Sequence, residues 1–215
     1  SLVRSHAAGT GPEVEEEVIR ALMLLRLSTL CTGRTGVRPV VVETYAKALN
    51  AGIVPVVREY GSLGCSGDLA PLAHCALALL GEGEVRVNGE LQDAGDALAA
   101  AGIEPLQLRE KEGLALINGT DGMLGQLCLA ITDLRAAAKT ADIATAMTVE
   151  GLLGTLVVFA DDLQQLRPHP GQADAAANIL QVAEGSEILE AALEEFKKNQ
   201  VQDAYSVRCL SLIHI

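Results

Sequence analysis

The feature that most constrains the fold is a long segment, residues 110–146, in which Leu, Ala and Ile recur at helical spacing. Glycines around Asn118 break this pattern near its start. The composition points the same way, because 49% of residues are hydrophobic while only 2% are aromatic and Trp is absent. Such a chain suits packing of Ala- and Leu-rich helices better than a sheet rich in aromatic and β-branched residues. We therefore predict a mainly α fold.

Shorter patterns place the remaining elements. Further helices are predicted to begin at Gly11-Pro12, where acidic residues follow, and to span residues 39–50, 69–80 and 148–166. Asp68 is the predicted N-cap of the helix at 69–80. The Asn88-Gly89 pair within an alternating segment predicts a small surface β-hairpin near residues 84–91.

No linker or repeat divides the sequence, so we expect one partial domain over residues 1–209, truncated at both ends. Residues 210–215 resemble the translation of a sequencing adapter and are expected to be a non-native tail.

Charge and cysteine usage exclude several classes of protein. The net charge of −12 argues against binding to nucleic acid or to an anionic membrane, which needs clustered Lys and Arg. Polar residues such as Asp121, Asp133 and Glu150 interrupt the apolar stretches before they reach the length of a membrane span. The five cysteines are scattered and form no Cys-x-x-Cys pair, so neither a disulfide framework nor a zinc site is expected. These features predict a soluble, cytoplasmic protein.

The residues most suited to chemistry lie in Gly64-Cys65-Ser66-Gly67-Asp68, a loop that passes directly into the predicted helix at 69–80. A phosphate cradle is one interpretation, since N–H groups at a helix start attract anions, but Asp68 puts a negative charge there and no P-loop lysine is present. A nucleophile elbow is excluded because Gly-x-Ser-x-Gly is absent around Ser66. Cys65 acting with His74 as a thiol nucleophile is a third interpretation, although such residues more often only pack.

A fourth interpretation rests on a resemblance. Residues 61–74, Gly-Ser-Leu-Gly-Cys-Ser-Gly-Asp-Leu-Ala-Pro-Leu-Ala-His, closely resemble a signature of the aromatic amino-acid ammonia-lyase and aminomutase family. In that family an Ala-Ser-Gly or similar triplet cyclises to the electrophile methylideneimidazolone (MIO). The resemblance implies that the Gly67 nitrogen attacks the Cys65 carbonyl carbon with loss of two waters, which leaves the Ser66 side chain as a methylidene. Cys65 stands where Ala is usual, but this residue lends only its backbone to the ring.

Other segments resemble the same family. Ser5-His6 matches the place where its members select the substrate ring, and Ser-His is the pair expected of members that act on histidine. A histidine there can exchange a proton at neutral pH. Asn118, within residues 112–120, matches a second signature and offers a donor and an acceptor to MIO or to substrate. The structural alternatives are a capped loop histidine and a buried asparagine paired with backbone.

Residues 201–209 match a third signature. Gln202, Tyr205 and Arg208 recur every three residues, so they share one side if this segment is a helical turn. Arg208 suits a bidentate hold on the substrate carboxylate, Gln202 a hydrogen bond to cofactor or substrate, and Tyr205 a catalytic role near the amine. Ser5 and Asp68 are expected to support these groups from behind. The alternative is a solvated polar turn.

The resemblance covers residues 1–209 and implies a long-helix bundle of the ammonia-lyase (fumarase/aspartase-like) type. It implies conversion of L-histidine to urocanate and ammonia, the first step of histidine degradation, by a homotetramer that uses MIO and no metal or nucleotide. Each site of such a tetramer combines residues from three subunits, including a tyrosine expected before Ser1 and a glutamate expected after Cys209. The isolated chain is therefore expected to be inactive.

Two alternatives stay open at this stage. The first is another MIO enzyme, either a tyrosine or phenylalanine ammonia-lyase or an aminomutase, for which Ser5-His6 is the discriminating feature. The second is a non-catalytic helical assembly module that shares the core packing.

Overall fold

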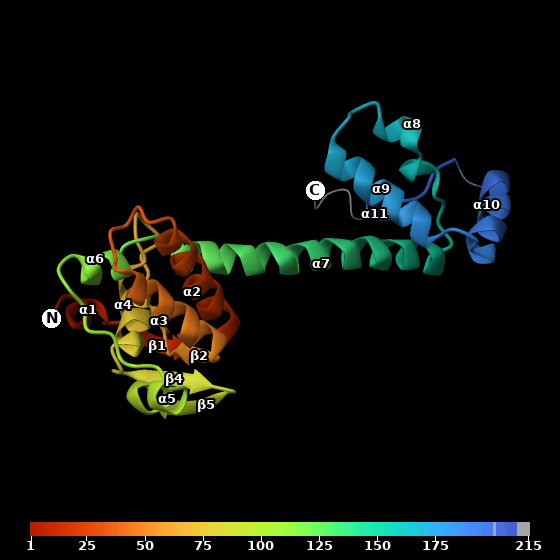
Figure 1. Cartoon of the computed structure of the whole chain (residues 1–215). Coiled ribbons are helices and arrows are strands. Elements are labelled where there is room, and N and C mark those ends of the chain that lie inside the picture. Colours follow the sequence, from red (N-terminus) through yellow and green to blue (C-terminus); the bar gives the residue numbers. More distant parts are fainter. Residues whose placement is uncertain (200, 210–215) are drawn as a thin grey trace. The chain divides into compact units, whose positions relative to one another are not determined.

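The computed structural model describes residues 1–199 and 201–209, which belong to two compact units, Ser1–Ala130 and Ile131–Ile215 (Figure 1). The structure is 60% helix and 9% strand, which confirms the predicted mainly α fold. The expectation of one partial domain over residues 1–209 stays a prediction. The expected tail at 210–215 lies outside the described residues.

The first unit is a group of helices with two small sheets at its edge. Its helices are α1 (Leu2–His6), α2 (Glu16–Cys31), α3 (Pro39–Asn50), α4 (Leu69–Leu79), α5 (Ala94–Ala100) and α6 (Glu112–Ile117). Helix α4 lies at the centre and packs against α1, α5 and α6. Leu72 and Leu79 on α4 are fully buried, and burial of each such side chain contributes about 1.5–3 kcal/mol. The helix that follows the predicted reactive loop is therefore also the core of this unit.

The strands form an antiparallel pair and a three-stranded sheet. They are β1 (Thr10–Glu13), β2 (Ile53–Pro55), β3 (Arg58–Tyr60), β4 (Glu84–Val87) and β5 (Glu90–Asp93). Strand β1 pairs with β3, and the other sheet has the order β2-β4-β5. The predicted hairpin is confirmed as β4 and β5, with Val87 opposite Glu90. Asn88 and Gly89 both have positive φ, which the two-residue turn requires.

The predicted helix start at Gly11-Pro12 is wrong. These residues belong to β1, and α2 begins only at Glu16. The physical reason is local backbone geometry, because Gly11 has φ +88° and its segment pairs with β3 instead of entering a helix. A Cβ on Gly11 would lie 2.5 Å from the Tyr60 ring, so the close approach of the two strands requires glycine here.

The long segment of residues 110–146 contributes to two helices, α6 and α7 (Asp121–Gly151), which are separated at Asn118 as predicted. The predicted helix at 148–166 is wrong beyond Gly151, because Leu153 has φ +53° and the chain then makes only short turns. Large apolar side chains on α7 are exposed: Leu124, Leu127, Ile131, Leu134, Ile143 and Met147.

Residues 112–151 also qualify by length and composition as one candidate membrane span, with a mean hydropathy of 1.3 in a window that is 28% buried. The expectation that polar residues would keep every apolar stretch too short is therefore not met by this criterion. One such helix is weak evidence for a membrane, since helices of soluble proteins meet the same criterion.

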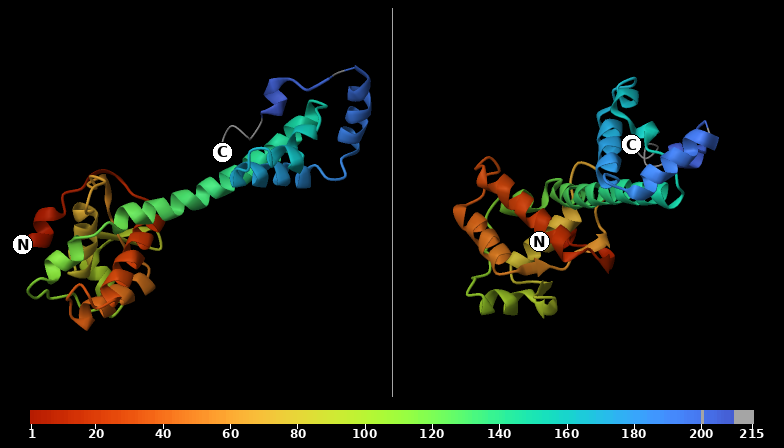
Figure 2. Two further views of the ribbon diagram at one scale, coloured as in Figure 1. Left: turned by 90° about the horizontal axis from the view of Figure 1, so that it is seen from above. Right: turned by 90° about the vertical axis from the view of Figure 1, so that its right-hand side faces the viewer.

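The second unit has its own core. After the C-terminal part of α7 come a 3₁₀ turn, η1 (Val157–Phe159), and the helices α8 (Asp161–Gln164), α9 (Pro170–Val182), α10 (Glu187–Asn199) and α11 (Tyr205–Arg208). Helix α9 packs against the C-terminal part of α7 (Figure 2), where Val149, Phe159 and Ile179 belong to one buried cluster. Asp203 is also buried and accepts hydrogen bonds from the Thr155 N–H (3.0 Å) and hydroxyl (2.6 Å). These bonds fix the segment just before α11.

Candidate active site

The predicted reactive loop connects β3 to α4 and changes from exposed to buried within a few residues. Cys65 and Ser66 are exposed, whereas Gly67 and Asp68 are buried. Gly64 has φ +61°, a left-handed conformation that favours glycine. The side chains of Cys65 and Ser66 therefore lie at the surface, and the loop is anchored at its buried end.

Gly67 lies in a confined space, where an added Cβ would require the Leu69 side chain to move. A Cβ on this residue would lie 2.9 Å from Leu69 Cδ1 and 3.3 Å from the amide Oδ1 of Asn118. The same contact shows that Asn118 reaches Gly67, although the two residues are far apart in sequence. The structure thus brings together two parts of the predicted site.

Asp68 holds the end of this loop by hydrogen bonds to a distant segment. Its N–H donates to the Gly119 carbonyl (2.7 Å). Its fully buried carboxylate accepts from the Ser62 hydroxyl and from the Met123 N–H (2.9 Å). We call Ser62, Asp68, Gly119 and Met123 the loop clamp.

The loop clamp corrects one expectation. Asp68 occupies the N-cap position of α4, but its side chain makes no capping hydrogen bond there. It instead accepts from the first turn of α7, where unpaired N–H groups and the helix dipole favour a carboxylate. Sequence alone suggested the nearer helix, because α7 is brought to Asp68 only by the tertiary fold.

Asn118 lies in the break between α6 and α7 with an extended backbone (φ −120°, ψ 101°). The residue is exposed, so the alternative of a buried asparagine paired with backbone is wrong. Its carbonyl accepts from Arg26 Nη1 (2.8 Å), while its side-chain amide makes no hydrogen bond with the residues that the structure describes. The amide is thus available to a ligand next to Gly67.

Ser5 and His6 lie at the end of α1. His6 Nδ1 lies 2.9 Å from the Leu2 carbonyl oxygen, which can only accept a hydrogen bond. When this bond is formed Nδ1 carries the proton, and in neutral His6 the other ring nitrogen, Nε2, is then an acceptor. Ser5 Oγ lies 3.1 Å from the same Nδ1 and donates to Leu2 (2.8 Å), so it supports this orientation of the ring.

The turn after His6 contacts both the reactive loop and α4. The Gly9 N–H donates to His74 Nε2 (3.2 Å), and a Cβ on Gly61 would lie 3.4 Å from Gly9 Cα. Partial burial, and then the charge of Arg58, lower the pKa of His74 and favour the neutral form that can accept this bond. His74 thereby ties the segment that carries His6 to the helix that follows the loop.

Arg208 contacts both Gln202 and Tyr205, and we call these three residues the surface trio. Arg208 Nη1 donates to Gln202 Oε1 (3.0 Å), and the Arg208 guanidinium lies 4.1 Å from the centre of the Tyr205 ring. Tyr205 is 74% exposed, while Arg208 Nε is buried and has no hydrogen-bond partner among the residues that the structure describes. The surface trio belongs to the second unit, whereas Ser5, His6, the reactive loop and Asn118 belong to the first. The catalytic and binding roles assigned to these residues stay predictions.

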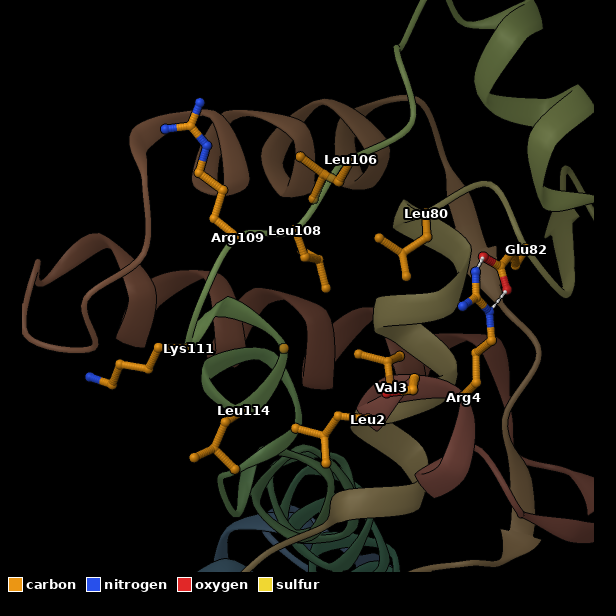
Figure 3. A pocket seen from close by; sticks show the side chains of 12 residues that line it. Leu2, Val3, Arg4, Leu80, Glu82, Leu106, Leu108, Arg109, Lys111 and Leu114 are labelled. Carbon is orange, nitrogen blue, oxygen red and sulfur yellow. Dashed lines mark hydrogen bonds and ion pairs between the residues drawn. The ribbon is translucent and has the colours of Figure 1, made fainter.

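A hollow of about 570 Å³ lies elsewhere on the first unit, between α1, the end of α4 and residues 106–114 (Figure 3). Leucines such as Leu80 and Leu106 line it, and Arg4 Nε donates to Glu82 (2.7 Å) at one side. None of the predicted site residues lines this hollow. We therefore place the candidate site at the loop and not here.

Sequence reasoning missed two buried charged residues of the first unit, one of which contacts Asn118. Arg26 contacts the Asn118 carbonyl, and Glu112 is buried at the start of α6, where Arg38 and two backbone N–H groups bind it. The signal for Arg26 was present, because it lies on the face of α2 that Leu22, Met23 and Leu30 bury in the core. A charged residue at such a position requires a specific partner.

The fold and the grouping of the reactive loop with Asn118 agree with what comparison with known proteins identifies. A profile of the aromatic amino acid lyase family matches residues 1–214, so the chain belongs to that family, of which MIO is characteristic. The predicted ammonia-lyase type of fold is thereby confirmed.

The relatives are more specific. The chain is 61% identical to a histidine ammonia-lyase of Streptomyces avermitilis and 59% identical to one of Streptomyces griseus. Each alignment covers 97% of this chain, and 41% and 40% of the respective relative, so the chain spans about two fifths of their length.

Two solved structures support the same fold. A tyrosine aminomutase from Streptomyces globisporus matches with a TM-score of 0.87 at 42% identity, over 99% of this chain and 43% of that chain. A histidine ammonia-lyase from Trypanosoma cruzi matches with a TM-score of 0.84 at 39% identity, over 99% of this chain and 38% of that chain.

Proposed function

We propose that the full-length protein carrying this chain is an ammonia-lyase that converts L-histidine to urocanate and ammonia. The observation that carries this proposal is the proximity of Gly67 to the Asn118 amide, which has no hydrogen-bond partner among the described residues, beside the exposed Cys65 and Ser66. Identity of 61% to a histidine ammonia-lyase supports histidine as the substrate, as does the Ser5-His6 pair.

The residues present fit an MIO group formed from Cys65, Ser66 and Gly67. Gly67 lies in a space that a Cβ would overfill, and Asp68 holds the following peptide through the loop clamp. In the part of the chain that the structure describes, Cys65, Ser66 and Gly67 make no hydrogen bond that would have to break before ring closure. Such a group supplies an electrophile that bonds to the substrate amine and makes it a better leaving group.

This chain's own side chains would bind and orient the substrate. His6 Nε2, left as an acceptor by the Nδ1 contact with Leu2, can accept the N–H of an imidazole ring. Arg208 would bind the carboxylate, which requires its Nη1 to share or exchange the bond that it makes with Gln202. The exposed Tyr205 hydroxyl would act near the amine, and the Asn118 amide would hydrogen-bond to the reacting end.

An MIO enzyme acting on another amino acid is the second candidate. The observation that favours it is the tyrosine aminomutase structure, which matches this chain at 42% identity, a value above that of the Trypanosoma cruzi enzyme. Against it stands the Ser5-His6 pair.

The full-length protein is further proposed to be a cytoplasmic homotetramer. Leu124, Leu127, Ile131 and Leu134 are exposed and are spaced by three and four residues, so they line one face of α7. An exposed apolar face of this kind is typical of a surface that packs against another protein chain. Sedimentation of the full-length protein should give four times the mass of one chain, and a monomer at working concentration would contradict this.

The reaction is tested with the intact mass of the full-length protein and with turnover of three amino acids. We expect a mass lower than the sequence by two waters, and turnover of histidine that exceeds turnover of tyrosine and phenylalanine. Ser66→Ala should abolish both the mass deficit and turnover, whereas Ser28→Ala, an exposed serine on α2, should change neither. An unmodified mass in an active, folded wild type would overturn the MIO assignment, and a preference for tyrosine or phenylalanine would overturn the substrate.

A further inference from the structure

Arg26 is a buried charged residue, and a contribution to stability alone does not explain why a charge lies at this position. Its side chain is 2% exposed on α2, among the apolar residues of the core. Its Nε has no hydrogen-bond partner among the described residues. Burying a guanidinium and leaving one donor unpaired both cost free energy, and an apolar side chain of similar size would avoid both costs.

The partners of Arg26 all lie at the break between α6 and α7. Its Nη1 donates to the Asn118 carbonyl (2.8 Å) and to Asp121 Oδ2 (3.1 Å). The first bond holds the backbone of a residue predicted to contact the substrate. The second neutralises the buried charge and fixes the first residue of α7.

The Arg26 guanidinium closely approaches the backbone at Gly119. A Cβ on Gly119 would lie 2.3 Å from Arg26 Nη1 and 2.3 Å from Asp121 Oδ2. The backbone of Gly119 is not in the left-handed region, so its conformation does not require glycine. Glycine is favoured here instead because the Arg26–Asp121 pair occupies the space that a Cβ would need.

The Asn118–Gly119 peptide in turn meets the reactive loop at two points. The Gly119 carbonyl accepts the Asp68 N–H (2.7 Å), and Asn118 Oδ1 faces Gly67. A shift of this peptide therefore moves the Asn118 amide relative to the residues that would form the electrophile.

We propose that Arg26 is a positioning residue that holds the Asn118 amide against Gly67 in the orientation needed for turnover; this inference rests on the proposed function. It does not touch the substrate and acts through Asn118. Because a displacement of about 1 Å can cost about 10²-fold in rate, loss of the Arg26 contact should lower kcat by about that factor while the KM changes little.

The test uses the full-length protein and a double-mutant cycle. Arg26→Lys keeps the charge but cannot reproduce the guanidinium geometry, and it should lower kcat about 10²-fold. Asn118→Ala should be more severe, and Arg26→Lys added to Asn118→Ala should cost less than about threefold more, because the residue through which Arg26 acts is gone. Losses that multiply in the double variant would overturn the proposal.

Gly119→Ala provides a second variant in which every polar group is kept. Its added Cβ must displace the flexible end of Arg26 or Asp121, so it should reproduce the fall in kcat even if Arg26→Lys does not fold. Arg20→Lys is the matched control, since Arg20 is exposed on the same helix, and it should leave kcat unchanged. Wild-type turnover in a folded Gly119→Ala variant or in folded Arg26→Lys would overturn the proposal.

These outcomes are separable from failure of the proposed function. If wild-type protein lacks the two-water deficit and turns over no amino acid, the proposed function fails before Arg26 is considered. If wild type is active and modified, the variants decide the role of Arg26 alone.

Discussion

The loop clamp and the surface trio hold their side chains in opposite ways. The loop clamp joins segments that are far apart in sequence through a fully buried carboxylate and backbone N–H groups. The surface trio lies within seven consecutive residues, with Tyr205 and Arg208 on the four-residue helix α11 and Gln202 just before it, and Arg208 contacts the other two. The loop clamp is therefore fixed by the core of its unit, whereas the surface trio can change partners at little cost in stability. Substitutions in the two regions should separate stability from activity.

The largest effect is expected at Glu112, a buried carboxylate at the start of α6, the helix that packs against α4. Its carboxylate accepts from Arg38 Nε (2.8 Å) and from the Arg109 N–H (2.7 Å), and these contacts, Arg38 first, lower its pKa from 4.5 to about 2. Glu112→Gln removes the charge of this buried pair, although Arg38 keeps the Gln107 carbonyl, and should lower the free energy of unfolding by about 3–5 kcal/mol. Denaturant unfolding of the full-length protein measures this, with exposed Glu110→Gln as the unaffected control.

The same group predicts a pH dependence. A carboxylate with a lower pKa in the folded state stabilises the fold above its unfolded pKa, and this contribution is lost as the pH falls from about 4.5 towards about 2. Stability of the wild type should fall across this window more steeply than that of Glu112→Gln. Parallel curves for the two proteins would show that Glu112 is not the responsible group.

Asp68→Asn is the direct test of the loop clamp and should have the next largest effect. It keeps the side-chain volume but removes the charge that Ser62 and Met123 bind, which should cost about 2–3 kcal/mol. The loop should then lose its anchor, so the two-water mass deficit should be absent from most molecules. Exposed Asp133→Asn is the control, and full modification in folded Asp68→Asn would argue against an anchoring role.

Arg208→Met in the surface trio should give the reverse pattern. The stability change should stay below about 1 kcal/mol, because the cation–π contact with Tyr205 lies at the surface and the bond to Gln202 is exposed. The value of kcat/KM should nevertheless fall about 10²-fold or more through loss of the hold on the substrate carboxylate. Arg167→Met, on the exposed surface of the same unit, is the matched control. A large loss of stability with normal kinetics would break the comparison.

The smallest effect is expected at His74. Its pKa is lowered in the folded protein, so the unfolded chain binds a proton more readily and stability should fall as the pH drops below the ordinary value of 6.5. His74→Gln can still accept the Gly9 N–H but does not titrate. Its free energy of unfolding should therefore change less than that of the wild type between pH 7 and pH 5, with a difference of under about 1 kcal/mol. His169→Gln, an exposed histidine of the second unit, should retain the wild-type slope.

Local patterns in the sequence predicted the elements that depend on nearby residues. The helix at 39–50, the break at Asn118 and the Asn88-Gly89 turn each follow from residues within a few positions. The proximity of Asn118 to Gly67 did not follow from either segment alone, because it depends on how α4, α6 and α7 pack. The family resemblance supplied that expectation.

The failures have the same origin. Gly11-Pro12 had the residues of a helix start, but pairing with β3 overrode the local preference. Asp68 was assigned to the nearer helix, and Arg26 was overlooked because its partners are more than ninety positions away. Buried polar contacts between distant segments are what single-sequence reasoning lacked in this chain.

The position of Asp68 between its loop and the first turn of α7 sets an order of events. If the ring closes only after this docking, closure happens in molecules that have already folded, and a covalent bond does not reopen when the protein later unfolds. The mass of a fully denatured sample would then show which molecules had once folded, since each modified molecule must have brought α7 to the loop before its ring closed. Counting modified chains in a misfolded or aggregated preparation would thus distinguish those that lost their native structure from those that never reached it.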